Sequence, residues 1–584
     1  MASSSPKTKI SPGAPSSAAL LSRYWLSRSS LRGWMLLASL LATTTLFLYS
    51  LNELTDWQKT FFDALGERNA GALRSIALQG LFILLLFIPA SSLSTYFQQW
   101  LQMEWRNWMT HDYLQKWLDS PAYHRIGQHN GAKELSDNPD QRVAEDISLL
   151  ADHVISLGIG FIKNLANIFI YGIKLWIISK ALQYYFFVGE PFQFHGLLII
   201  CTVVFVLCGS LIMEKLVKPM VNVDYQLQRH EADFRHSLFN VRDNAEQIAL
   251  YRGHAREKKR ALQHFSAIYR NWRQFMRFTR RRTLTENVYM QAGNYFPYFF
   301  TLPSYFSRLI SLGDVMQLNM ACARLRSSLS WFVYNYQELA IVRATLQRLR
   351  EFEAQLAMPA HSALHYGITS DGSLQLHHVE LTRPDGSVIN RIEHFAIQQG
   401  QRCLLQGPSG SGKSTLLRTL AHLWPYGSGD VMLPETGNML FLPQKSYIGE
   451  GTLKAALTYP QPDVSLSDED GANLLKRVGL NHYAPDLNSA AEWSKQLSPG
   501  EQQRLAFARV LYTQPDYLFL DEATSALDAR AEWEMYTLVL TALPEVTLLS
   551  VAHHAALRSL HSMVVDLPST QQNIDAYSAS AQET

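Results

Sequence analysis

Long apolar runs constrain the fold of this chain more than any other feature of its sequence. The first run extends from Gly33 to Leu51, behind three arginines, and no small-residue cleavage pattern closes it. A run of this length crosses a hydrocarbon core of about 30 Å as a helix, so we interpret it as a retained span and not as a signal peptide. The candidate spans are 33–51, 76–97, 153–178, 197–217, 288–306 and 315–336. The sequence therefore predicts a polytopic α-helical membrane domain with six spans.

Charge divides the chain into two unlike parts. Residues 1–360 hold 38 Lys+Arg and 26 Asp+Glu, whereas residues 361–584 hold 14 and 24, so the net charge of +2 is an average of opposites. Sixteen Lys/Arg lie between Lys215 and Arg282. The positive-inside rule places this connection, the N-terminus and the 98–152 connection in the cytoplasm. The basic residues flank apolar spans and not a compact fold, so we expect no nucleic-acid partner.

The last two spans are the most polar, and a transport pathway is expected there. Asn294 and two prolines interrupt the fifth span, and Arg324 and Arg326 lie inside the sixth. Ionisable residues at membrane depth usually face a water-filled cavity or a partner. The two arginines therefore line a cavity, or the span boundary is misplaced and they lie near the interface.

A phosphate-binding loop follows in the acidic part. The strand-like segment 402–406 leads into a match to G-x-x-x-x-G-K-[ST], and a helix over 415–423 follows it. Glycines let backbone N–H groups surround phosphates at the helix N-terminus, while Lys413 reaches the β- and γ-phosphates and Ser414 ligates Mg²⁺. The residues expected to contact the nucleotide are Gly407, Pro408, Ser409, Gly410, Ser411, Gly412, Lys413, Ser414 and Thr415. We expect ATP and Mg²⁺ as cofactors.

Two acids follow an apolar strand, and the first of them lies 107 residues after Ser414. The strand Tyr517–Leu520 is followed by Asp521 and Glu522. An Asp in this position holds Mg²⁺, and a Glu one residue later can polarise the attacking water. The second part of the chain is therefore predicted to be an α/β nucleotide-binding domain that hydrolyses ATP.

The segment Leu497-Ser498-Pro499-Gly500-Glu501-Gln502 resembles the LSGGQ-type signature of ATP-binding cassette (ABC) transporters, with Pro499 at the first Gly and Glu501 at the Gln. The resemblance implies that Ser498 and the backbone of Gly500, with Glu501 beside them, close on the nucleotide bound by the opposite subunit. Proline removes one backbone donor, so one contact of the signature is in doubt.

Other elements of the family match in order. Gln444 resembles the Q-loop glutamine, which links Mg²⁺ to the membrane domain, Asp528 the D-loop aspartate, and His553 the switch histidine. The aromatic residue that stacks on adenine is replaced near Arg383, whose guanidinium plane can also stack on a base. The resemblance therefore implies catalytic roles for Glu522, His553 and Gln444, and Mg²⁺ ligation by Ser414, Asp521 and Gln444.

The same resemblance implies the domain plan and the assembly. ABC motors sandwich two nucleotides between two domains, and this chain carries one, so we expect a half-transporter with a type I exporter-like membrane domain that works as a C₂ homodimer. Membrane lipid and a transported solute are the other partners. The expected domains are a disordered tail at 1–22, the six-span domain at 23–340, a linker at 341–370 and the nucleotide-binding domain at 371–584.

A second motif narrows the family. Asn138-Pro139-Asp140-Gln141-Arg142 is a good helix start, with Asn138 as N-cap and Pro139 at the first helical position. It also resembles the bacterial SbmA/BacA-like group fused to an ABC motor, and peroxisomal half-transporters share a related motif. This resemblance implies a bacterial inner-membrane protein that imports peptides or another bulky solute. Export or flipping of an amphipathic lipid, acyl compound or peptide, and a membrane-anchored regulatory ATPase, remain alternatives.

Overall fold

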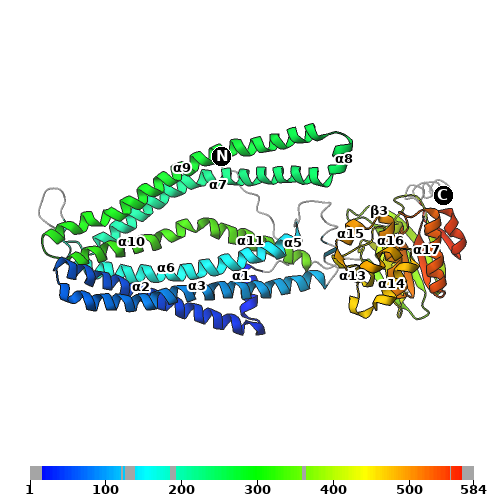
Figure 1. Cartoon of the computed structure of the whole chain (residues 1–584), viewed down its shortest axis with the longest axis horizontal. Coiled ribbons are helices and arrows are strands. Elements are labelled where there is room, and N and C mark those ends of the chain that lie inside the picture. Colours follow the sequence, from blue (N-terminus) through cyan, green and yellow to red (C-terminus); the bar gives the residue numbers. More distant parts are fainter. Residues whose placement is uncertain are drawn as a thin grey trace, which may run out of the picture. The chain divides into compact units, whose positions relative to one another are not determined.

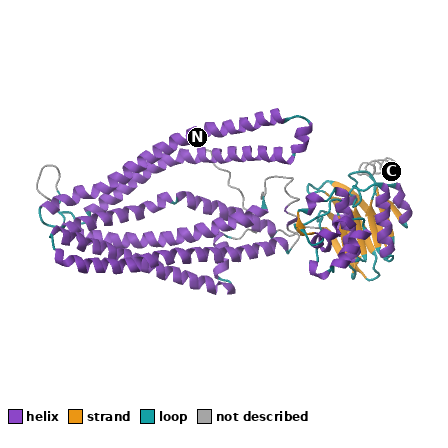
Figure 2. Cartoon of the chain, in the orientation of Figure 1, coloured by secondary structure: helices purple, strands orange, loops and turns teal. Residues whose placement is uncertain are grey.

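The computed structural model describes residues 16–119, 123–124, 126, 138–184, 193–357, 363–552 and 554–568. Contacts divide the chain into two compact units, Met1–Asp119 with Ser136–Leu356, and Ser120–Leu135 with Ala357–Thr584. The first unit is built from helices, and the second mixes helices with strands (Figure 2). The predicted fold class, a helical membrane domain followed by an α/β domain, is confirmed, and the individual domain boundaries stay a prediction.

Long helices make up the first unit (Figure 1). In chain order its helices are α1 (Ser17–Trp25), α2 (Leu31–Gly66), α3 (Leu73–Leu118), α5 (Pro139–Gln141), the π-helix η3 (Arg142–Asp146), α6 (Ile147–Ile178), α7 (Leu197–Asp243), α8 (Ala245–Leu250), α9 (His254–Phe306), α10 (Leu312–Tyr334) and α11 (Tyr336–Leu356), with short 3₁₀ turns η1 (Arg28–Ser30), η2 (Ala70–Ala72) and η4 (Ser179–Ala181). Since about 20 residues cross a bilayer, α3, α7 and α9 extend well beyond one.

Four helices are long and apolar enough to cross a membrane, and all four coincide with predicted spans. They are Arg28–Gly66, Ala70–Leu118, Pro139–Ala181 and Leu197–Leu216 within the described residues. The fifth and sixth predicted spans fall on α9 and α10, which are helical there but do not meet the same apolar criterion. Arg324 and Arg326 lower the hydropathy of α10, and Asn294 together with several tyrosines and two prolines lowers that of the 288–306 part of α9.

Small and hydroxyl side chains let the membrane helices pack closely. Along α2 the residues at 36, 40, 44, 48, 51 and 55 are buried, which is one side of a helix and faces α3. Thr44 and Ser94 share a hydrogen bond of 3.0 Å across that contact. Gly80 lies against Trp57, where a Cβ would come within 2.7 Å of the indole.

Helix α10 packs against α2, α6, α7 and α9, while α7 and α9 form a long antiparallel pair joined by α8 (Figure 1).

Two larger sheets and the two-stranded sheet β7-β8 are found among the described residues of the second unit. The strands are β1 (Ala363–Thr369), β2 (Leu374–Thr382), β3 (Val388–Ile397), β4 (Arg402–Gln406), β5 (Gly427–Pro434), β6 (Met439–Leu442), β7 (Gly451–Thr452), β8 (Ala490–Ala491), β9 (Tyr517–Asp521), β10 (Thr547–Val551) and β11 (Met563–Asp566). A parallel sheet has the order β11-β4-β10-β9-β6, and a second sheet has the order β1-β5-β2-β3. In the parallel sheet β4, β9 and β10 are almost fully buried, as continuous apolar runs between helices require.

The helices of the second unit cover the parallel sheet. They are α12 (Lys413–Leu420), α13 (Leu453–Thr458), α14 (Asp468–Arg477), α15 (Trp493–Gln496), α16 (Pro499–Thr513) and α17 (Ala529–Ala542), with 3₁₀ turns η5 (Asp463–Ser465), η6 (Asn481–Asp486) and η7 (Ala555–Leu560). The largest apolar core joins α13, α14, α16 and α17 to β9 and β10. Because β4, β9 and β10 run parallel as neighbours, the residues after their carboxyl ends meet at one edge.

The helix start at Asn138 differs from the prediction. Pro139 is the first helical residue, as expected, but the Asn138 side chain makes no capping hydrogen bond and its backbone is left-handed, with φ +61°. Gln141 donates to Glu145 at 2.9 Å and does not reach back to the cap. The first turn continues directly into the π-helix η3, a local widening that recurs at functional positions in other proteins.

Candidate functional site

Three glycines shape the loop between β4 and α12. Gly407, Gly410 and Gly412 have φ of +141°, +83° and +92°, a region that glycine adopts without steric cost. A Cβ on Gly407 would lie 2.4 Å from the Leu567 carbonyl oxygen, and one on Gly412 would lie 2.8 Å from Ile389. The chain can therefore turn tightly here and direct backbone N–H groups toward the N-terminus of α12, with Pro408 and Ser409 in the turn and Thr415 in the first turn of the helix.

Lys413 and Ser414 begin α12 and face the end of β9. The Lys413 ammonium donates to the carbonyl oxygens of Gly407 and Pro408 at 2.8 and 2.9 Å. The Ser414 hydroxyl donates to Asp521 Oδ1 at 2.8 Å, although the two residues are 107 positions apart. The structure thus joins the loop to the first acid at the end of the neighbouring strand.

The second acid lies next to Gln444. The side-chain amide of Gln444 donates to Glu522 Oε2 at 3.0 Å. Glu522 has a left-handed backbone, with φ +50°, which costs a non-glycine residue about 1 kcal/mol or more. Its backbone N–H donates to Val551 O at 3.1 Å, so β10 holds the strained residue in place. Strain of this kind is concentrated at functional positions.

Burial governs the electrostatics of the site. It lowers the pKa of Lys413, and the nearby Glu522 and Asp521 carboxylates oppose that change. Burial raises the pKa of Asp521, which the Ser414 hydrogen bond and Arg418 oppose. A buried cation and a half-buried carboxylate near each other gain from a ligand that brings both signs of charge, such as a polyphosphate with a divalent cation.

The donor set fits ATP and Mg²⁺. Mg²⁺ is commonly held by one or two carboxylates together with substrate phosphates and water, and the site offers one hydroxyl and Asp521. In the described part of the chain no group of three or more His, Cys, Asp or Glu side chains could hold a metal without such a substrate. The Ser411 hydroxyl is buried and has no hydrogen-bond partner among the described residues, so one polar group of the loop remains for a ligand.

The predicted signature residues begin α16 in a capping box. The Ser498 hydroxyl accepts from Glu501 N and donates to Glu501 Oε2, which also accepts from Ser498 N at 2.8 Å. Pro499 occupies the first helical position, where no N–H is needed. Gly500 lies against the Ala526 carbonyl oxygen and the Leu527 side chain. No hydrogen bond between described residues joins Ser498 or Gly500 to the phosphate loop of the same chain.

Three further predicted residues have separate surroundings. Asp528 caps α17, accepting from Ala531 N at 2.7 Å. Arg383 lies on the turn between β2 and β3 and donates to Ser387 Oγ at 3.1 Å. His553 lies outside the described residues. The roles of all the site residues stay predictions.

Two buried amides connect the site, and no local sequence pattern predicts either of them. Gln503 of α16 donates to Gln444 O at 3.4 Å and to Ser525 Oγ at 3.2 Å, and accepts from Ala526 N at 2.9 Å. Asn390 of β3 donates to Ser411 O at 2.7 Å and thereby holds the phosphate loop. Each bridges segments far apart in sequence, so only their burial, which local pattern does not reveal, could have indicated them.

A buried carboxylate contacts His554, the residue that follows the expected switch histidine in the sequence. Glu532 of α17 accepts from Thr524 Oγ1 at 2.5 Å and contacts His554 Nδ1 at 2.6 Å. Apolar surroundings leave Glu532 only 3% exposed. This pair fixes the chain one residue beyond the expected switch histidine.

Part of the 98–152 connection belongs to the second unit. The described residues His124 and Ile126 group with it, and Ile126 is buried. Burial and the nearby Arg418 lower the pKa of His124. Since Arg418 lies on α12, directly after the phosphate loop, this connection reaches the helix that carries Lys413.

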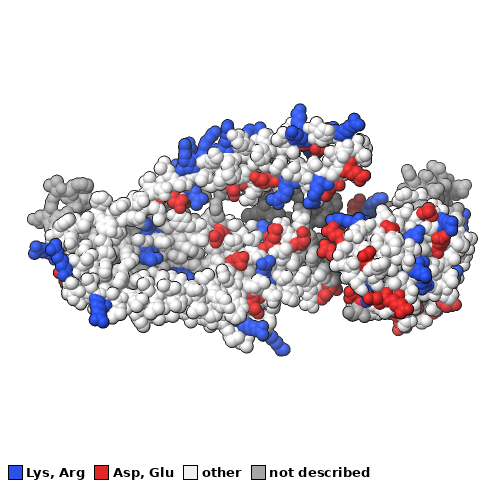
Figure 3. Space-filling model, viewed as in Figure 1, with Lys and Arg blue, Asp and Glu red and all other residues white. Residues whose placement is uncertain are grey.

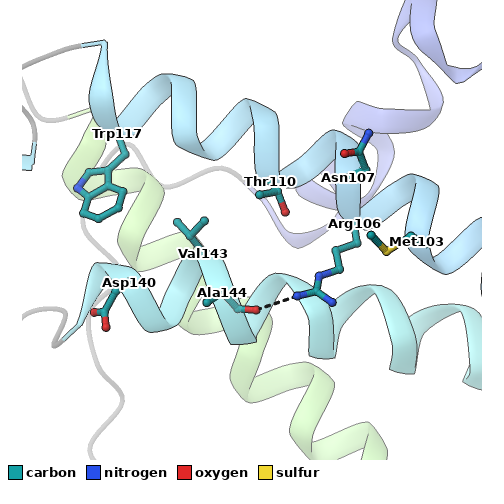
Figure 4. Close-up of a pocket in the computed structure, with 8 residues that line it drawn as sticks. All are labelled: Met103, Arg106, Asn107, Thr110, Trp117, Asp140, Val143 and Ala144. Carbon is teal, nitrogen blue, oxygen red and sulfur yellow. Dashed lines mark hydrogen bonds between the residues drawn. The ribbon is translucent and has the colours of Figure 1, made fainter. Parts of the chain in front are cut away.

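A hollow in the membrane unit is bordered by the 138–142 motif. It has a volume of about 500 Å³ and lies between α3 and the α5–η3 segment (Figure 4). Arg106 donates to Ala144 O at 3.3 Å across it, and Asp140 of the 138–142 motif borders it. The motif is therefore part of the base of α6 and contacts α3.

Comparison with known proteins agrees with both units. Residues 21–306 match the family model "ABC transporter transmembrane region 2" and residues 391–525 match "ABC transporter". The chain is 32% identical over 556 residues to the inner membrane ABC transporter ATP-binding protein YddA of Escherichia coli (strain K12), covering 94% of this chain and 96% of that one. It is 25% identical over 592 residues to the human lysosomal cobalamin transporter ABCD4, covering 93% and 92%.

Among solved structures, a bacterial Atm1-family ABC exporter with ATP bound superposes with a TM-score of 0.68 at 16% identity, covering 93% of this chain and 95% of that one. This likeness shows the fold, in which one chain supplies one membrane region and one ATP-binding domain. Such a half-transporter implies dimerisation. The chain belongs to the ABC transporters, membrane proteins whose ATP-binding domain hydrolyses ATP to drive transport.

Proposed function

We propose that the chain forms a C₂ homodimer in a bacterial inner membrane and imports a peptide or another bulky solute. The hydrogen-bonded cluster of Ser414, Asp521, Gln444 and Glu522 supports ATP-driven work most directly. The similarity to a protein named as an inner-membrane transporter supports the location. The SbmA/BacA-like resemblance of the 138–142 motif supports import and the solute class.

The residues of the cluster divide the work on ATP. The glycine loop and Lys413 bind the phosphates, while Ser414, Asp521 and Gln444 would hold Mg²⁺, which when bound supplies positive charge to the phosphate oxygens. Glu522 orients and deprotonates the attacking water, and its contact with Gln444 keeps the carboxylate in place. His553 would stabilise the γ-phosphate as charge develops on it.

The signature supports a two-chain site. Gly500 lies against Ala526 and Leu527, and neither Ser498 nor Gly500 makes a hydrogen bond to its own phosphate loop within the described residues. In a C₂ dimer each signature closes on the nucleotide of the partner, and Asp528 lies at that junction. Both nucleotides then bring the two ATP-binding domains together, and hydrolysis separates them.

The test uses the full-length protein in lipid vesicles. Glu522→Gln should bind ATP and reduce turnover by at least about 100-fold, as expected when a general base is lost, whereas Glu534→Gln, on the exposed side of α17, should leave turnover unchanged. Uptake is then compared in inside-out vesicles and intact cells. Accumulation in cells supports import, accumulation in vesicles means export, and ATP turnover without movement of any solute favours the regulatory ATPase. Undiminished turnover in Glu522→Gln contradicts the assigned base.

A further inference from the structure

Three basic side chains share one depth in the membrane unit. Gly160 of α6 lies against Trp331 of α10, where a Cβ would be 3.0 Å from the indole. Toward the other end, Lys174 of α6 and Gln317 of α10 both bind Asp56 Oδ1, at 2.7 and 2.6 Å. The two helices are therefore antiparallel. Their register puts Lys163, Arg324 and Arg326 within about 6 Å of one another along the helix axes.

The contacts that Lys163 makes with described residues are to uncharged groups. Its ammonium donates to Ser94 Oγ of α3 at 3.3 Å, and Ser94 in turn shares its hydrogen bond with Thr44 of α2. The ammonium also lies 5.6 Å from the centre of the Phe47 ring. Its side chain is half-buried. The charge is thus directed toward α2 and α3 and stabilised there by a hydroxyl and an aromatic face.

Arg326 fits into a space that α9 leaves for it. It is 6% exposed and donates to Asn294 Oδ1 at 2.8 Å and to Met290 O at 3.4 Å. Gly293 makes that space, since a Cβ there would be 1.5 Å from the guanidinium nitrogen. The guanidinium is hydrogen-bonded by an amide and a carbonyl, and neither cancels its charge.

Arg324 lies on a different side of α10. It is seven residues from Gln317, which binds α2, and seven from Trp331, which packs on α6. Seven residues are two helical turns, so Arg324 shares their face and points between α2 and α6. Its side chain is half-buried, and no described residue forms a hydrogen bond or ion pair with it. Lys163 and Arg324 are therefore both accessible.

Carboxylates are absent from this layer. The six predicted spans contain a single acid, Glu214. Gly209 packs on Tyr289, and Tyr289 contacts Ser330, so these three residues lie at a similar depth. Glu214 lies five residues past Gly209. It is therefore well beyond Arg326 in depth. Lys174, in contrast, is paired with Asp56. On the face shown in Figure 3, much of the membrane unit carries no charged side chains, whereas basic side chains gather along α9.

Resting on the proposed transport function, we propose that this cationic layer binds an anionic group of the transported solute, a carboxylate or a phosphate. Lys163 and Arg324 make the contact. Arg326 is a positioning residue that joins α10 to α9 and adds to the field. Unpaired basic side chains at membrane depth are costly and need a counter-charge. In a homodimer the partner's spans carry no further acid for the layer, so the solute must supply that charge.

The experiment measures how ATP hydrolysis by the full-length protein responds to matched probes. In one arm phosphatidylcholine vesicles receive tetraglutamate or tetralysine, and in the other they contain increasing phosphatidylglycerol. The anionic probe of at least one arm should stimulate ATP turnover, and the arm that responds identifies a soluble solute or a lipid headgroup. Lys163→Gln and Arg324→Gln should raise the half-maximal concentration of that probe by about 10-fold, the loss of one close charge contact.

Control variants separate charge from folding. Arg326→Lys should keep more of the response than Arg326→Gln, and Lys180→Gln, exposed at the end of α6, should respond like the wild type. Stimulation by tetralysine alone, an unchanged response in Lys163→Gln and Arg324→Gln, or neither stimulation nor thermal stabilisation by the anionic probes would overturn the inference. If the wild type hydrolyses no ATP under any condition, the proposed function itself is wrong.

Discussion

Arg348 of α11 binds the buried carboxylate of Asp146 through two hydrogen bonds, Nε to Oδ2 at 2.9 Å and Nη2 to Oδ1 at 2.6 Å. Arg142 donates to the same Oδ2 at 2.9 Å. Asp146 ends the π-helix that follows the 138–142 motif, and its side chain is 3% exposed. This parallel, charge-assisted pair fixes the base of α6 to the helix that leads out of the membrane unit.

Asp146→Asn should destabilise the membrane unit markedly. The change leaves two guanidinium groups against a neutral amide, and removing one partner of a buried ion pair costs about 3–5 kcal/mol. Since Arg348 is partly exposed, the lower end of that range is expected. The measurement is thermal unfolding of the purified protein. Arg348→Lys, which can make only one of the two bonds, should fall between Asp146→Asn and the exposed control Arg343→Lys.

Glu501→Gln should preserve the start of α16 but release the Ser498 hydroxyl. Either side chain can accept from the Ser498 N–H, so helix stability should change little, whereas Glu501→Ala should cost about 1 kcal/mol by loss of the cap. In the structure the Glu501 carboxylate accepts a hydrogen bond from the Ser498 hydroxyl. If Ser498 serves the partner's nucleotide, Glu501→Gln should lower the ATP concentration for half-maximal turnover. A higher concentration than wild type would contradict that role.

Pro499→Gly tests the departure from the family signature. Gly costs about 0.5–1 kcal/mol relative to a residue that fits the helix, because the unfolded chain gains freedom. It also restores a backbone donor at this position. We expect slightly lower thermal stability with equal or higher ATP turnover. Pro499→Ala restores the donor without the extra freedom and separates the two effects.

Gln503→Ala should slow hydrolysis more than it weakens ATP binding. Gln503 positions Gln444 and the 525–526 turn, and it touches neither the phosphate loop nor Lys413. Small displacements of positioning groups can cost about 10- to 100-fold in rate. Single-turnover rates and nucleotide affinity are measured together. Gln502→Ala, which removes two hydrogen bonds on the same helix turn, is the matched control and should leave the rate near wild type.

Motif spacing predicted the parts of the site that face the nucleotide. The loop at 407–414 and the acids at 521 and 522 were identified because each lies directly after a buried strand, and parallel strands bring such ends together. The Ser414–Asp521 contact follows from that rule. Four spans could be predicted equally well from the sequence, since length and apolarity alone define them.

The remaining features depend on partners that no local pattern specifies. Gln503 and Asn390 are ordinary polar residues in sequence, and their importance comes from burial between distant segments. The left-handed backbone of Asn138 does not follow from its neighbours, which fit a helix cap, and the π-helix after it contacts α3 and α11. Sequence pattern does not single out Lys163, because a single cation does not interrupt a strongly apolar run.

Stability of the ATP-binding unit should fall below about pH 6.5 because of His561. This histidine is 9% exposed. Its Nδ1–H donates to Leu557 O at 2.7 Å, so the Nε2 of the neutral ring accepts from the Ser550 hydroxyl. Burial lowers its pKa below the usual value, and Arg402 adds to that effect. The unfolded chain therefore takes up a proton at a pH where the folded chain stays neutral, so the free energy of unfolding decreases as pH falls, by up to about 1.4 kcal/mol per pH unit. Unfolding of the full-length protein is followed from pH 8 to about pH 5. His561→Gln should lose part of this slope, whereas the exposed His365→Gln should retain it. An identical slope in all three proteins would assign the acid sensitivity to other groups.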